Sequence, residues 1–215
     1  MNLPRLRPDR VTLEGRYARL EPLALTHAAD LLEASSDPER FRYLFDVPPA
    51  GLADLRAWIE RCAKLEDQLY FAVIDRTTGK AGGRQALMRI TPEHGVIEIG
   101  NILWGPAIAR TRIASEAFFL AARYVFDELG YRRFEWKCNN RNEPSKAAAR
   151  RFGFTFEGVF RQHMWVKGAD RDTAWFSIID REWPAIRAAF ERWLEPENFD
   201  SAGRQRSKLK AGSAV

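Results

Sequence analysis

The spacing of apolar residues changes near the middle of this chain, and that change constrains the fold more than any other feature. Residues 69–74, 81–90 and 96–104 show strand patterns separated by turns, which predicts an antiparallel meander. Residues 113–129 then carry apolar side chains at helical spacing, and residues 132–138 alternate as a strand again. If the strands on either side of this helix share a sheet, they are parallel and joined by a right-handed crossover.

Other segments add helices and strands on both sides of this unit. The predicted class is α/β (α+β), with one mostly antiparallel mixed sheet flanked by helices. Further strand patterns cover residues 17–22, 155–166 and 173–179, and further helical patterns cover residues 25–36, 51–67, 142–152 and 181–194.

Length and composition describe an ordinary globular chain. With 215 residues, 46% of them apolar, the sequence fits one domain with a sizeable core. No apolar run approaches the roughly 20 residues that span a bilayer, and the first residues lack the apolar stretch of a secretory signal. Cys62 and Cys138 lie far apart and the chain has three histidines, so we expect neither a disulfide framework nor a metal site. These features predict a cytoplasmic protein with no membrane partner.

The net charge of +5 comes mostly from the C-terminal end. Four basic residues and no acid lie within residues 201–215, namely Arg204, Arg206, Lys208 and Lys210. Removing these four from the 34 basic residues leaves 30, against 29 acidic ones. Residues 1–200 are therefore predicted to form a single domain, and residues 201–215 a disordered basic tail. Such a tail is either solvated or in salt-dependent contact with RNA or a ribosome, whereas we expect no nucleic-acid partner for the nearly neutral domain.

The most informative local feature is the junction between the strand at 96–104 and the following helix. A Gly-Pro pair turns the chain, and the helix is predicted to begin near residues 111–113, with Arg110 and Arg112 beside its first turn. A helix N-terminus presents unpaired N–H groups and a partial positive charge, so cations there are unfavourable unless an anion shares the site. A bound phosphate would account for both arginines. Alternatively, both extend into solvent.

Several short motifs follow one another across the middle of the chain. They are Glu98-Ile99-Gly100, Ala114-Ser115-Glu116-Ala117, Asn142-Glu143-Pro144-Ser145, Gly153-Phe154 and Glu157-Gly158. In this order and spacing they resemble the RimJ/RimL-like (ribosomal-protein-acetyltransferase-like) branch of the GNAT superfamily of N-acetyltransferases. Each motif is weak alone, but together they are specific, and the resemblance extends from about residue 19 to residue 184.

The resemblance implies the GNAT acyl-CoA N-acyltransferase fold, with acetyl-CoA or another acyl-CoA as co-substrate and no metal. The strands at 96–104 and 132–138 would splay apart as a parallel pair, and the pantetheine arm would enter the gap. An N–H near Gly100 would polarise the thioester carbonyl. The implied cofactor-binding residues are Ile102, Leu103 and Trp104 through their backbone, Asn142 for the pantetheine, and Arg110, Thr111, Arg112, Ile113, Ala114 and Ser115 for the pyrophosphate.

One loop departs from the family. The usual phosphate loop is Gln/Arg-x-x-Gly-x-Gly/Ala, whose glycines let the backbone approach the phosphates, but this chain has Ala107, Arg110 and Arg112 at the three positions. Either the guanidiniums take over part of the phosphate binding, or the loop is remodelled and the affinity for CoA is altered or lost. We favour retained binding, because two cations suit a polyanion better than an empty helix terminus.

Two residues are candidates for the acylation chemistry. Glu98, on the strand that would lie under the thioester, is nominated as general base acting through water; its alternative role is that of an outward-facing sheet residue paired with a basic neighbour. The tyrosine that many GNAT enzymes use as general acid is replaced by Ala149. The family then implies that Ser145 hydrogen-bonds the departing thiolate, and its alternative role is capping the first helical turn behind Asn142.

These observations lead to three functional hypotheses, in decreasing order of support. The first is an enzyme that transfers an acetyl group from acetyl-CoA to a primary amine of a small molecule or protein N-terminus, by direct attack in a ternary complex. The second is a GNAT-fold protein that binds acyl-CoA without turnover, and the third is a ribosome- or RNA-associated protein that uses its basic tail. The sequence identifies neither the amine acceptor nor the acyl chain, and a homodimer is compatible with it without an identifiable interface.

Overall fold

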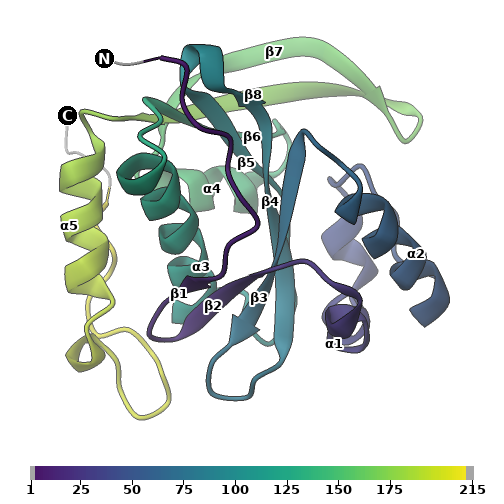
Figure 1. The fold of residues 1–215 in the computed structure, drawn as a ribbon, viewed down its shortest axis with the longest axis horizontal. Helices are drawn as coiled ribbons and strands as arrows, with labels where there is room; N and C mark the ends of the chain where they lie inside the picture. Colours follow the sequence, from purple (N-terminus) through teal and green to yellow (C-terminus); the bar gives the residue numbers. More distant parts are fainter. Residues whose placement is uncertain (1–2, 212–215) are drawn as a thin grey trace.

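The computed structural model describes residues 3–211, which form an eight-stranded mixed sheet with strand order β1-β2-β3-β4-β5-β6-β8-β7 (Figure 1). Neighbouring strands are antiparallel except β5 and β6, which are parallel. The strands are β1 (Leu13–Glu14), β2 (Ala18–Pro22), β3 (Gln68–Asp75), β4 (Ala81–Thr91), β5 (Val96–Trp104), β6 (Arg133–Asn139), β7 (Thr155–Val166) and β8 (Ala169–Ile179).

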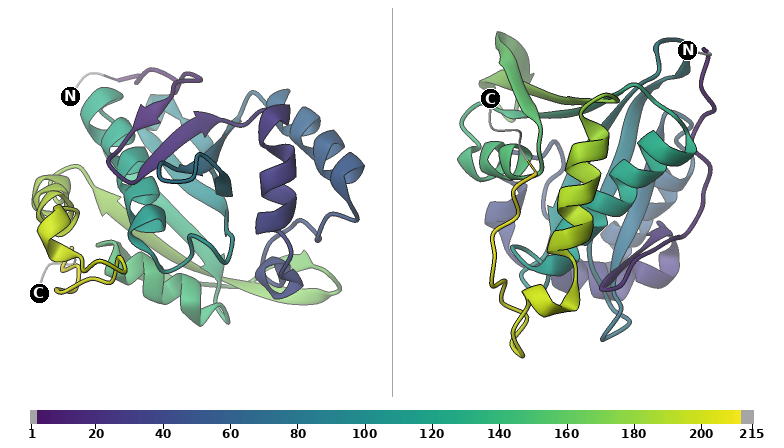
Figure 2. Two further views of the ribbon diagram at one scale, coloured as in Figure 1. Left: turned by 90° about the horizontal axis from the view of Figure 1, so that it is seen from below. Right: turned by 90° about the vertical axis from the view of Figure 1, so that its left-hand side faces the viewer.

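Helices lie on both faces of this sheet (Figures 1 and 2). They are α1 (Ala28–Ala34), α2 (Leu52–Ala63), α3 (Arg112–Arg123), α4 (Glu143–Arg151) and α5 (Trp183–Trp193). One face packs against α3 and α5 through a cluster of aromatic rings, in which the ring of Phe118 lies 4.5 Å from that of Phe152 and 5.6 Å from that of Phe190. The other face packs against α1 and α2 over β3 and β4.

The predicted mixed sheet with one parallel strand pair is confirmed, while several boundaries, among them those of α2, α3 and β8, differ from the sequence patterns. β8 begins at Ala169 rather than at residue 173, because Lys167 and Gly168 form a tight turn with φ of 52° and 76° and the two strands pair up to it. The helix after β5 is α-helical only to Arg123 and continues as a π-helix over Tyr124–Glu128.

β5 and β6 pair over only part of their length. Their register runs from Val96 opposite Arg133 to Ile99 opposite Trp136 and stops there. Just beyond this point β5 bulges against β4, where Asn101 has a φ of 50°. The strands therefore separate after Ile99, as expected for the splayed pair.

The turn between β1 and β2 is fastened to α3 by a buried carboxylate. Glu116 is 4% exposed and accepts hydrogen bonds from the N–H groups of Arg16, Tyr17 and Ala18, at 2.8, 2.5 and 2.6 Å. The glutamate of the Ala-Ser-Glu-Ala motif thus has a structural role, because it satisfies three main-chain donors of a sequence-distant turn.

Disorder is a wrong prediction for residues 201–211. They fold back along α5, where the indole Nε1 of Trp193 donates to Oε1 of Gln205 and to the carbonyl of Ser207, both at 3.0 Å. Leu209 and Ala211 are buried. These apolar side chains join the main hydrophobic core, which the local composition does not indicate, whereas residues 212–215 of the expected tail lie outside the described residues.

Candidate active site

The open end of the splayed pair presents main-chain groups of β5. Past Ile99, and within residues 3–211, β5 has no strand partner on the β6 side, and this stretch contains Ile102, Leu103 and Trp104, the residues expected to pair with the pantetheine. The carbonyl of Trp104 accepts a hydrogen bond of 2.7 Å from Nη1 of Arg40. The side chain of Arg40 therefore already satisfies one group on this edge.

The loop between β5 and α3 adopts a left-handed backbone at an arginine. Arg110 has a φ of 63°, a region in which glycine is unstrained and other residues are uncommon. Thr111 follows as the N-cap of α3, with its Oγ1 accepting from the N–H of Ile113 at 3.2 Å and donating to the carbonyl of Ile108 at 2.6 Å. Arg110 thus adopts the left-handed conformation that suits a glycine at this position of the loop.

The first turn of α3 retains two unused donors. The N–H of Ser115 bonds the carbonyl of Thr111 at 3.4 Å, and that of Ile113 is used by the cap. The N–H groups of Arg112 and Ala114 have no hydrogen-bond partner within the described part of the chain. These two groups are the ones that an anion at the helix N-terminus would meet.

The two arginines of the loop have different surroundings. The guanidinium of Arg112 lies 4.1 Å from the ring centroid of Tyr17 and 5.1 Å from that of Phe199, so aromatic rings hold it. Arg110 is exposed. Of the two guanidiniums expected to flank a phosphate, only that of Arg110 extends from the loop into solvent.

A third arginine, which sequence analysis missed, reaches the same helix terminus. Nη1 of Arg151, the last residue of α4, donates to Oγ of Ser115 at 2.9 Å. Burial lowers the pKa of Arg151, and no carboxylate pairs with it among residues 3–211. A partly buried cation without a carboxylate partner therefore lies at the first turn of α3, and the position of Arg151 before Gly-Phe carries no sequence signal for this contact.

The backbone at Arg110 leads to a testable prediction about stability. Because φ is positive, Arg110→Gly should change the free energy of unfolding by less than about 1 kcal/mol, whereas Arg110→Val should lower it by about 1 kcal/mol or more. Urea unfolding of both variants measures these values. The matched control is Arg192 in α5. Because glycine destabilises a helix more than valine does, Arg192→Gly should lower the free energy of unfolding more than Arg192→Val. If the glycine variant were the less stable of the two at both positions, the role of the left-handed backbone at Arg110 would be contradicted.

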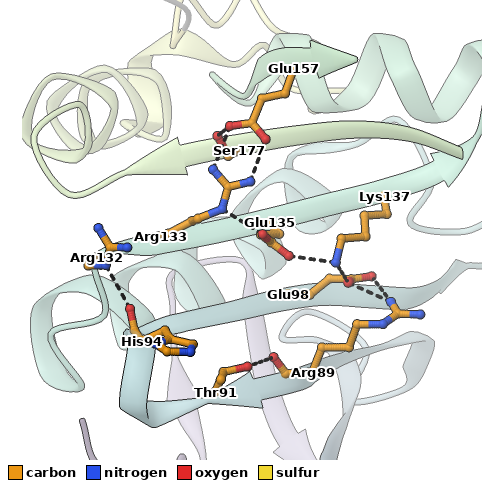
Figure 3. Close-up of polar contacts among 10 residues, drawn as sticks. All are labelled: Arg89, Thr91, His94, Glu98, Arg132, Arg133, Glu135, Lys137, Glu157 and Ser177. Carbon is orange, nitrogen blue, oxygen red and sulfur yellow. Dashed lines mark hydrogen bonds and ion pairs between the residues drawn. The ribbon is translucent and has the colours of Figure 1, made fainter. Parts of the chain in front are cut away.

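Glu98 lies within a ladder of alternating charges that crosses the sheet (Figure 3). It is 3% exposed, and its Oε2 lies 2.7 Å from Nη1 of Arg89 and 2.9 Å from Nζ of Lys137. Glu98 is also the residue just before Ile99, where the pairing with β6 stops. The basic neighbours of the alternative role are thus present, and the carboxylate lies at the start of the open end, where a general base would be needed.

The ladder continues across β6 to β7. Lys137 also pairs with Glu135 at 2.7 Å, and Arg133 joins Glu135 at 2.7 Å to Glu157 at 2.6 Å. The hydrogen bond from Arg133 lowers the pKa of Glu157, and the same contact raises the pKa of Arg133. Three cations therefore meet three carboxylates, and the ladder is electrically balanced (Figure 3).

Asn142 and Ser145 lie where α4 begins, beside β6. Oδ1 of Asn142 accepts from the N–H of Ser145 at 3.1 Å, so Asn142 is the N-cap of α4. The hydroxyl oxygen of Ser145 accepts from the indole Nε1 of Trp136 at 3.0 Å, and Trp136 is the last residue of β6 paired with β5. The hydroxyl proton of Ser145 is therefore not needed for the contact with Trp136.

Residues 3–211 contain neither a cluster of metal ligands nor a membrane-spanning helix. Within residues 3–211, no group of three or more histidine, cysteine, aspartate or glutamate side chains is arranged to hold a metal ion. The helices of this same part of the chain are too short or too polar to cross a membrane.

The sequence of this chain is similar to those of known acetyltransferases. A protein family described as the acetyltransferase (GNAT) domain matches residues 18–155. The chain is also 30% identical over 179 residues to the uncharacterized N-acetyltransferase p20 of Bacillus licheniformis, an alignment that covers 80% of this chain and 98% of p20.

Comparison with solved structures agrees. A GCN5-related N-acetyltransferase from Brucella melitensis is 57% identical, with a TM-score of 0.94 and 96% of each chain covered. RimL, described as a ribosomal L7/L12 alpha-N-protein acetyltransferase in complex with coenzyme A, is 20% identical, with a TM-score of 0.68, 79% of this chain and 99% of RimL covered. At that identity the likeness to RimL concerns the fold alone.

Proposed function

This chain belongs to the GNAT family of N-acetyltransferases, and from that premise we propose that it transfers an acetyl group from acetyl-CoA to a primary amine of a small molecule or protein N-terminus. The reaction is a direct attack in a ternary complex. The observation that carries the proposal is the splayed β5–β6 pair, whose open edge lies between the caps of α3 and α4. An extended amide chain fits such an edge by adding hydrogen bonds to unpaired backbone groups.

The residues around this edge suit the parts of coenzyme A. Ile102 to Trp104 offer the open strand edge to the pantetheine, and Asn142, whose Oδ1 serves the helix cap, has its side-chain N–H₂ left for an amide carbonyl. The free N–H groups of Arg112 and Ala114, with the guanidiniums of Arg110 and Arg151, would meet the pyrophosphate. We therefore propose Arg151 as a further phosphate-binding residue.

Acetyl-CoA supplies the activated acetyl group, and the chain supplies the proton transfers and the oxyanion donor. An N–H of β5 near Gly100 would donate to the thioester oxygen. Glu98, oriented by Arg89 and Lys137, would accept a proton from the amine through water. The hydroxyl of Ser145 would direct its proton at the departing thiolate.

The acceptor is a primary amine whose identity these contacts leave open. RimL is described as acting on the N-terminus of a ribosomal protein, which makes a protein N-terminus one class to test. Small-molecule amines are the other class, because acceptor sites differ between proteins of one fold. Loss of CoA binding through the missing glycine is not favoured, since Arg110 has the left-handed backbone conformation that a glycine would adopt there.

Isothermal titration calorimetry with acetyl-CoA and with CoA tests the cofactor part of this proposal. We expect a Kd in the micromolar range. Arg151→Ala should weaken binding by about tenfold, since it removes a charge-assisted contact. The matched control is Arg123→Ala, at the opposite end of α3, which should leave the Kd unchanged. No detectable heat with either ligand would contradict the proposal, and binding in the wild type justifies a screen of amines for thiol release.

A further inference from the structure

Two buried donors on one face of β8 have no partner within residues 3–211. Arg171 is 7% exposed, and its Nε is buried without a hydrogen bond; the indole Nε1 of Trp175 is in the same state. The two residues are four apart on one strand, so their side chains lie on the same face of the sheet. Nζ of Lys137 lies 3.9 Å from the ring centroid of Trp175, which places this face on the side of Glu98. Buried donors without partners are rare and call for an explanation.

Arg171 is a buried cation that the neighbouring acids do not neutralise. No hydrogen bond or ion pair of its guanidinium is formed with residues 3–211. The charge ladder is balanced within itself, and Asp46 pairs with Arg84 at 2.7 Å. The guanidinium of Arg171 instead lies 4.7 Å from the ring centroid of Phe45. A buried charge without a counter-ion is costly, so an anion bound from outside the chain would stabilise Arg171.

The strand register places this face beside the groups around the proposed base. Trp175 on β8 lies opposite Lys137 on β6, and Nζ of Lys137 lies 2.9 Å from Oε2 of Glu98. Burial lowers the pKa of Arg171, and among the smaller causes Arg89 lowers it further and Glu98 raises it. The face that carries Arg171 and Trp175 therefore borders the open end of the β5–β6 pair.

A short loop is held over this face. Nζ of Lys167, in the turn between β7 and β8, donates to the carbonyls of Phe41 and Asp46 at 2.8 and 2.7 Å. Phe45, which covers Arg171, belongs to the loop that these two bonds hold. Figure 1 shows the β7–β8 hairpin reaching toward the side of α2. Arg171 thus lies between the sheet and a loop that Lys167 holds in place. Partly enclosed polar groups of this kind orient small ligands in binding sites.

We propose that Arg171 and Trp175 bind a carboxylate of the acceptor, so that the acceptor is an amine that also carries a carboxylate. The guanidinium and the indole N–H supply donors for the carboxylate oxygens, while the amine faces Glu98 on β5. This inference rests on the proposed acetyl transfer and names the substrate class of that site. The carboxylate comes either from a free amino acid or from an acidic side chain near a protein N-terminus.

Paired probes test the inference. Thiol release from acetyl-CoA is measured with L-amino acids against their α-carboxamides, and with short peptides that carry aspartate against asparagine at the second position. We expect kcat/KM for the carboxylate member of one pair type to exceed that of its neutral partner by about tenfold or more. Arg171→Gln should abolish this preference, because kcat/KM for the carboxylate probes should fall by about tenfold or more relative to the neutral probes, and Trp175→Phe should reduce it. Arg161→Gln, an exposed arginine on the same hairpin, should keep the preference.

The outcomes separate this inference from the proposed function. Equal use of carboxylate and neutral probes, or a preference that survives in Arg171→Gln, would overturn the inference while leaving acetyl transfer intact. A preference in the amino-acid arm alone indicates a small-molecule acceptor, and one in the peptide arm alone indicates a protein N-terminus. The inference is also overturned if acetyl-CoA binds, but no carboxylate probe is acetylated and none binds the CoA complex in calorimetry. Absence of acetyl-CoA binding contradicts the proposed function itself.

Discussion

Replacing Glu98 with glutamine is expected to lower kcat for acetyl transfer by about 10²–10⁴-fold, the usual contribution of general base catalysis. The amide has nearly the same shape and cannot accept the proton that the amine loses. The carboxylate lies one residue before the end of the β5–β6 pairing, where the amine and the thioester would meet. Steady-state thiol release at saturating acetyl-CoA measures the change, and the Kd for acetyl-CoA should vary by less than about twofold, since Glu98 does not contact the proposed phosphate site.

A matched variant separates chemistry from the loss of an ion pair. Glu135 is buried and pairs with the same Lys137 at 2.7 Å, so Glu135→Gln disturbs the ladder without touching the proposed base. Both variants should lose stability to a similar degree, because each leaves a buried cation short of one carboxylate. Only Glu98→Gln should lose most of its kcat. Equal losses of kcat in the two variants would show that Glu98 acts as part of the ladder and not as the base.

Replacing Glu116 with alanine is expected to lower the free energy of unfolding by about 3–5 kcal/mol. Its buried carboxylate is the partner of three main-chain N–H groups, and all three would lose that partner. The space around it is also filled, since a Cβ added at Gly15 would lie 2.6 Å from Cδ of Glu116. Urea unfolding followed by circular dichroism measures the change.

The control for this prediction is Glu14, an exposed acid at the end of β1, just before the same turn. Glu14 forms exposed ion pairs with Arg76 at 3.3 Å and Arg19 at 3.9 Å, and Glu14→Ala should cost less than about 1 kcal/mol. Glu116→Gln, which keeps one acceptor oxygen, should fall between Glu116→Ala and the wild type. A loss of less than about 1 kcal/mol in Glu116→Ala would contradict a structural role for this glutamate.

The candidate site shows where prediction from sequence succeeded and where it stopped. The helix start at Thr111 and the cap at Asn142 follow from residues within one turn of each other, and both are present. The environment of Arg112 could not be predicted in this way, because Tyr17 and Phe199, the rings that hold its guanidinium, come from distant parts of the chain. Arg151 was missed for the same reason, since its contact with Ser115 depends on how α4 packs against α3.

The sequence by itself determined the order and type of the longer secondary-structure elements and the family motifs, whereas the short strand β1 was missed. Side-chain period, turn residues and caps act over a few neighbouring positions, so they can be read along the chain. Only the tertiary structure decided that Glu116 holds a distant turn, that residues 201–211 fold onto α5, and that Nε of Arg171 and Nε1 of Trp175 are buried without partners among residues 3–211. Burial and pairing depend on which distant elements meet in space, and the periodicity of one segment does not contain that information.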